Sequence, residues 1–143
     1  MTVLWRDLKS ELVDRLGIGM EALWSLVRTA QSGVFALSLI EPLDEDMRLS
    51  DAAMDLALAL DEMEEVSPAL AAGGISVDLG PVRLDDLGDY RASILGLLGA
   101  AIDVVALMLR EQVEELDTPE LMSLATVASS INSARQLLLV PAT

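Results

Sequence analysis

The feature that most constrains the fold is the spacing of apolar residues, which recurs every three or four positions along almost the whole chain. This spacing puts apolar side chains on one face of an α-helix, whereas a half-buried strand would need strict alternation. A first helix is predicted to stop at Gly17 and a second to end before Pro42. Their apolar stripes are Leu4, Leu8, Leu12 and Leu16, then Met20, Leu23, Trp24, Val27, Val34 and Leu37.

Capping residues predict where the later helices begin. Ser50 is the predicted N-cap of a third helix that runs to Val66, with Asp51 in its first turn. Asp85 is predicted to cap the next helix, and Thr118 to open the last one. The chain of 143 residues has the size of one domain. The prediction is a single all-α domain over residues 1–143, a bundle of about five helices, with N-terminal helices in 1–45, a core in 50–116 and a C-terminal helix in 118–140.

Composition narrows the chemistry that the chain can perform. There is no cysteine and no histidine, so disulfides, zinc-thiolate sites and the commonest general base are excluded. The net charge is −15, from 24 acidic against 9 basic residues, which disfavours binding of nucleic acid through its phosphates. Any catalysis would have to use carboxylates, hydroxyls, arginines or a hard metal ion.

The sequence gives little sign of a membrane segment. Residues 92–109 are apolar and would span about 27 Å as a helix, but Asp103 inside them would cost roughly 2.5–3.5 kcal/mol at bilayer depth. The first 13 residues form a charged amphipathic pattern that lacks the apolar run of a signal peptide. We therefore expect no membrane association and a cytoplasmic location.

Two groups of acidic residues are predicted to face inward. Asp61, Glu62 and Glu65 fall within about 100° of one another on the third helix, on a stripe shared with the apolar Met54 and Leu58. Carboxylates turned toward a core need a cation or a proton, because an uncompensated buried charge costs several kcal/mol.

The second group lies at the start of the following helix. Asp86 and Asp89 are spaced i, i+3, and their helix face continues as Ser93, Leu97, Ala100 and Val104. If the two helices are antiparallel neighbours, four carboxylates could converge on one Mg²⁺ ion, which prefers oxygen ligands. The sequence thus predicts a magnesium site.

The same residues resemble a known family. The run 61–66, DEMEEV, followed by Ala69 and Leu70, resembles the EExxE signature of the all-α nucleoside triphosphate pyrophosphohydrolases, the MazG-like group. The run 86–89, DLGD, resembles that family's ExxD signature, and the resemblance covers roughly residues 54–113.

The resemblance implies a MazG-like core in residues 50–116 and a usually oligomeric enzyme that uses Mg²⁺ to hydrolyse a nucleoside triphosphate to the monophosphate and pyrophosphate. Glu62, Glu65, Asp86 and Asp89 would ligate Mg²⁺, and Asp61 would stand in for the first glutamate of the signature. Asp61, Glu62 and Glu65 would be the catalytic carboxylates, positioning a metal-activated water for attack.

Other interpretations remain open. The aspartates at 85, 86 and 89 could serve only to cap a helix, and the acids at 61–65 only to solvate one. An acidic helical bundle could instead be a non-catalytic interaction module, such as an inhibitor or immunity protein, that binds a basic partner. A third possibility is a subunit of an obligate oligomer, since 52% of the residues are hydrophobic. Asp103 could cap a helix or pair with Arg28.

Overall fold

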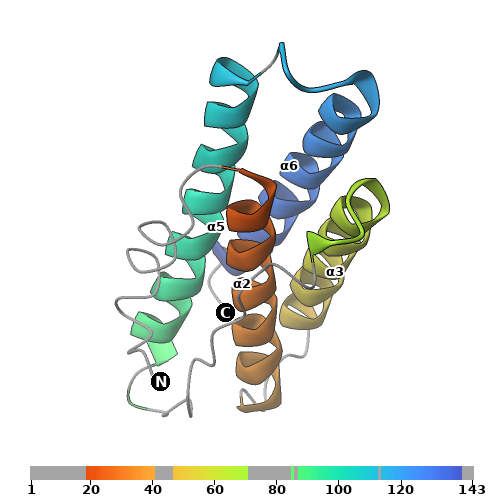
Figure 1. Ribbon diagram of the computed structural model, residues 1–143. Helices are drawn as coiled ribbons and strands as arrows, with labels where there is room; N and C mark the ends of the chain where they lie inside the picture. The colour runs from red at the N-terminus through yellow and green to blue at the C-terminus, as the bar shows by residue number, and fades with distance from the viewer. Residues whose placement is uncertain (1–18, 41–46, 71–84, 86, 113, 140–143) are drawn as a thin grey trace.

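The computed structural model describes residues 19–40, 47–70, 85, 87–112 and 114–139. These residues form four long helices: α2 (Met20–Ile40), α3 (Arg48–Val66), α5 (Leu87–Glu111) and α6 (Thr118–Leu139) (Figure 1). The predicted all-α class is confirmed. The predicted helix with the first leucine stripe lies outside the described residues.

The four helices form a bundle in which each packs mainly against two others. Both α3 and α5 pack against α2 and against α6, so α3 and α5 lie on a diagonal of the bundle. Figure 1 shows that α3 and α5 run in one direction and α2 and α6 in the other, which makes every packed pair antiparallel. Since α3 ends at one end of the bundle and α5 begins at the other, the two helices do not form an antiparallel hairpin.

The core follows the helical spacing of apolar residues. The second helix matches its predicted stripe, because Leu23, Trp24, Val27, Val34 and Leu37 are all buried. Alanines also take part in the core, and their small size allows neighbouring helices to approach closely. The fully buried alanines of the four helices include Ala30, Ala52, Ala59, Ala101 and Ala134.

The start of α3 differs from the prediction. The helix begins at Arg48, two residues before the predicted cap Ser50, and the cap position is held by Met47 in a left-handed conformation with φ 54° and no side-chain cap hydrogen bond. The reason is packing. Leu49 is buried, and only a helix that already includes it places its side chain on the same face as Ala52 and Leu56. Asp51 lies in the first turn, as predicted.

The last helix begins at Thr118, as predicted, but its cap is the preceding residue. Asp117 Oδ1 accepts a hydrogen bond of 2.9 Å from the backbone N–H of Glu120, which satisfies one of the free donors of the first turn. In α5 the first residue is Leu87, so the predicted cap Asp85 lies two residues before the helix and is exposed. Asp86 lies outside the described residues.

A side chain of α5 contacts the end of α6. Arg91 Nη1 donates a hydrogen bond of 3.4 Å to the carbonyl oxygen of Leu138, so α5 supplies the cation that α6 lacks in its own last turn.

Within the described part of the chain, α5 is the one helix long and apolar enough to cross a membrane. Nine of its residues are buried, as expected for the core helix of a bundle.

Candidate functional site

The acidic residues predicted to form a metal site lie on the surface. Asp61 and Glu65 are exposed near the end of α3, and Glu62 is partly buried beside them. Asp89 is exposed in the first turn of α5. The predicted ligand Asp86 lies outside the described residues. The expectation that these carboxylates turn toward the core is therefore wrong for Asp61, Glu65 and Asp89.

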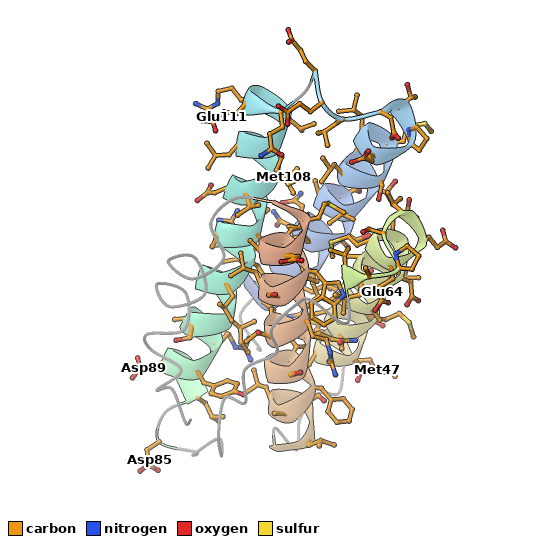
Figure 2. All side chains as sticks on the ribbon, viewed as in Figure 1. Met47, Glu64, Asp85, Asp89, Met108 and Glu111 are labelled. Atoms are coloured by element: carbon orange, nitrogen blue, oxygen red, sulfur yellow. The ribbon has the colours of Figure 1, made fainter. Side chains whose placement is uncertain are left out.

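The two acidic groups also lie at opposite ends of the bundle. Asp61, Glu62 and Glu65 are near the C-terminal end of α3, which lies toward the end of the bundle where α5 finishes (Figure 1). Figure 2 shows Asp85 and Asp89 at the other end, where α5 begins, and Glu111 at its finish. The sequence-based geometry assumed that the two helices were antiparallel neighbours, but they are parallel and diagonal.

A single chain therefore does not bring Glu62 and Glu65 to Asp89. Within the described ranges, no group of three or more acidic residues is arranged to hold a metal ion. A magnesium site built from Glu62, Glu65 and Asp89 would need residues from more than one copy of the chain, and it stays a prediction.

The stripe of α3 that faces the core is a different one from the stripe predicted. Met54 and Leu58, which share a face with the acids, are 62% and 54% exposed. The buried residues of α3 are Leu49, Ala52, Leu56, Ala59, Leu60 and Met63. The acids of α3 thus accompany exposed apolar side chains on the side of the helix that points away from the bundle.

We call this surface the outer face of α3 and define it by five residues. They are Asp51, Met54, Leu58, Asp61 and Glu65, all exposed. With 3.6 residues per turn they fall within about 80° of one another around the helix. The outer face therefore combines two apolar side chains with three carboxylates in a single line.

The acids at the end of α3 do not stabilise the helix that carries them. The C-terminal end of a helix bears partial negative charge, and α3 has no basic residue in its last turn. Asp61 and Glu65 are spaced i, i+4, and Glu62 and Glu65 i, i+3, so like charges are neighbours on the helix surface. Neither capping nor pairing within α3 accounts for these residues.

In Figure 1, α2 begins, α3 ends and α6 begins at this same end of the bundle. Residues from these three helix ends line an open hollow. Its volume is about 530 Å³, and three of its lining residues are acidic: Glu65, Asp117 and Glu120. The other lining residues are Met20, Val66, Ser67 and Pro119. Glu65 belongs to both the hollow and the outer face of α3, so the two surfaces are continuous.

Sequence reasoning missed the contribution of α6 to this hollow. Asp117 and Glu120 have the D-x-x-E pattern of a helix start, and the cap bond confirms that role. Their proximity to Glu65 depends on the packing of α6 against α3, which the sequence does not specify. The sequence therefore indicated the helix cap at Asp117, but it gave no sign that Asp117 and Glu120 would share a surface with Glu65.

Arg28 and Arg91 both have hydrogen-bond partners within the bundle. Arg28 Nη1 donates to Gln31 Oε1 at 2.8 Å and to Ser32 Oγ at 3.2 Å. Asp103, for which a helix cap and a pairing with Arg28 were the two alternatives, is exposed in the interior of the continuous helix α5 and so caps no helix. Arg91 contacts the end of α6. Both arginines therefore have structural contacts.

Comparison with known protein families, with curated proteins and with solved structures gives no match. The resemblance to the MazG-like group accordingly remains a prediction from short motifs.

Proposed function

We propose that this chain is a non-catalytic acidic helical bundle whose function is to bind a basic protein partner. The observation that carries the proposal is the outer face of α3, where Met54 and Leu58 are exposed among Asp51, Asp61 and Glu65. Surfaces that bind proteins combine an apolar centre with a polar rim. The composition of this face fits that pattern.

The charge of the molecule defines the class of partner. A net charge of −15 attracts cationic proteins, raises their association rate and repels nucleic acids and anionic membranes. The partner expected from this charge is a protein segment rich in lysine or arginine.

The pyrophosphohydrolase hypothesis has less support from the geometry. It needs the acids of α3 and those at the start of α5 around one metal ion, and these lie at opposite ends of the bundle. Binding requires only that acids and apolar side chains share an accessible surface. The interaction module is therefore the function that the arrangement of residues supports best.

The test uses a synthetic peptide that forms a basic amphipathic helix, with leucines on one face and lysines on the other. Isothermal titration calorimetry of the full chain should give a 1:1 complex that weakens when NaCl is raised from about 50 to about 300 mM, because salt screens the attraction. A scrambled peptide of the same composition cannot present an apolar face, so its affinity should be at least about tenfold lower.

Two results would overturn the proposal. Equal affinity for the scrambled peptide would mean that only unspecific charge attraction is at work. Release of pyrophosphate from nucleoside triphosphates that requires Mg²⁺, and that is lost in Glu65→Gln without loss of folding, would establish the enzyme instead.

A further inference from the structure

We infer that the outer face of α3 is a docking surface for one basic amphipathic helix of a partner protein, whose lysine or arginine side chains extend into the acidic hollow beside Glu65. The inference rests on the proposed function and adds the binding surface and the form of the partner. It is carried by the spacing of the exposed residues, by their chemistry and by the continuity of the face with the hollow.

The spacing is that of a helix–helix seam. From Asp51 to Glu65 the exposed positions follow one another at intervals of three, four, three and four residues, the repeat that keeps side chains facing a partner helix. The line is about 21 Å long at 1.5 Å per residue. A partner helix of about four turns would cover it.

The distribution of residue types along the line suits such a partner. The apolar pair Met54 and Leu58 lies in the middle, with Asp51 on one side and Asp61 and Glu65 on the other. Binding energy concentrates in a central apolar cluster that becomes fully desolvated, while charged rims select the partner. The flexible methionine side chain adapts to the shape of the surface that covers it.

The hollow extends the acidic end of the line. Glu65, Asp117 and Glu120 place carboxylates from the end of α3 and the start of α6 around about 530 Å³ of open space. The last turn of α3 adds the partial negative charge of its free carbonyl groups and contains no cation of its own. A lysine or arginine of the partner would supply the missing positive charge.

A second copy of the chain suits this surface poorly. Another copy also carries a net charge of −15. In a two-fold symmetric contact through the outer face, each acid would meet Leu58, Met54 or another acid, because the face contains no basic residue. Charge complementarity therefore favours a basic partner over self-association.

The test compares two double variants that make identical chemical changes on different faces. Met54→Ser with Glu65→Lys alters the outer face of α3, and Met122→Ser with Glu111→Lys is the control on α6 and α5. Met54 and Met122 are 62% and 67% exposed, and Glu65 and Glu111 are both exposed acids in the last turn of their helices. The two variants have the same net charge and lose the same apolar side chain.

Calorimetric titration with the leucine–lysine peptide should show that the outer-face variant binds at least about tenfold more weakly than the native chain. The control should bind within about twofold of the native chain, since changes away from an interface act only through long-range charge. Equal effects in the two variants would overturn the docking surface and leave the proposed function standing. No binding by the native chain would overturn both.

A second measurement needs no variant with altered charge. In the native chain carrying ¹³C-methyl methionine, the Met54 signal, assigned from Met54→Leu, should shift on adding peptide while the Met122 signal stays in place. The reverse pattern would overturn the inference. So would a dimer of the native chain in analytical ultracentrifugation that the outer-face variant dissociates, since the face would then be a contact between copies.

Discussion

Trp24 Nε1 and Ser123 Oγ are buried polar atoms with no hydrogen-bond partner among the described residues. Trp24 follows Met20 by four residues and Ser123 follows Pro119 by four, so each lies one turn further along its helix than a residue that lines the acidic hollow. A buried polar atom without a partner loses its bonds to water and lowers stability. The unpaired hydroxyl of Ser123 is therefore expected to lower the stability of the bundle.

Ser123→Ala tests whether the unpaired Ser123 hydroxyl lowers the stability of the bundle, and Ser25→Ala is its matched control. Both serines are helical and almost fully buried, but Ser25 Oγ donates a hydrogen bond of 2.7 Å to the carbonyl oxygen of Glu21. Ser123→Ala should be the more stabilising change, by about 1 kcal/mol of unfolding free energy. Urea unfolding followed by circular dichroism measures both. A lower stability for Ser123→Ala than for Ser25→Ala would show that the Ser123 hydroxyl has a partner, such as a buried water.

Within the elements, α3 shows a conflict between stability and its surface charge. Its last turn and a half contains Asp61, Glu62, Glu64 and Glu65 and no basic residue. This charge opposes the helix dipole and places like charges at neighbouring positions. Residues that lower the stability of their own helix are typical of binding surfaces.

We expect Glu65→Gln to stabilise the chain by about 0.5–1 kcal/mol at low salt, because it removes one charge from the negative end of α3 and its repulsion with Asp61 and Glu62. Glu21→Gln is the control and should lower the stability, since Glu21 lies in the first turn of α2, where a negative charge favours the helix. Urea titrations at low ionic strength give both values. A loss of stability in Glu65→Gln would mean that Glu65 has a favourable partner in the folded chain.

The helices could be predicted well from the sequence, but the side of each helix that faces the core could be predicted less well. The apolar stripe from Leu23 to Leu37 was sufficient for α2 because large apolar residues repeat there without competition. In α3 the large residues Met54 and Leu58 indicated the wrong face. The core face carries the large residues Leu56, Leu60 and Met63, so large apolar residues lie on two sides of α3 and their spacing alone does not select the buried side.

The position of the acids could not be predicted because it depends on topology. The length of the chain between α3 and α5 is compatible with either an antiparallel hairpin or a return along the bundle, and the sequence does not distinguish them. Asp89 shares a helix face with the buried Leu97 and is still exposed, because it lies in the first turn of α5, at the end of the bundle. Helical spacing predicts the direction of a side chain but not whether a neighbouring helix is present to cover it.

For the whole molecule, the dominant physical quantity is the net charge of −15 on 143 residues. Mutual repulsion of the acids destabilises the compact state. If the chain binds a basic partner as proposed, the partner would reduce this repulsion, and binding and folding would stabilise each other. Under the proposed function, the charge that selects a basic partner would also make the free chain less stable than its apolar core alone would allow.

This repulsion should appear as a salt effect on thermal stability. Raising NaCl from about 20 to about 500 mM shortens the screening length from roughly 20 Å to a few ångströms, so the melting temperature should rise by about 4 °C for each kcal/mol of repulsion removed. Circular dichroism at fixed protein concentration measures the melting temperature at each salt concentration.

Sodium chloride also strengthens apolar burial slightly, so a variant with fewer charges is needed as a control. Asp103→Asn with Glu114→Gln and Glu115→Gln changes three exposed acids and reduces the net charge from −15 to −12. Repulsive energy scales with the square of the charge, so the salt-induced rise in melting temperature should be about one third smaller in this variant. A rise of equal size in both proteins would show that salt acts on apolar burial, and the net charge would then not limit the stability of the bundle.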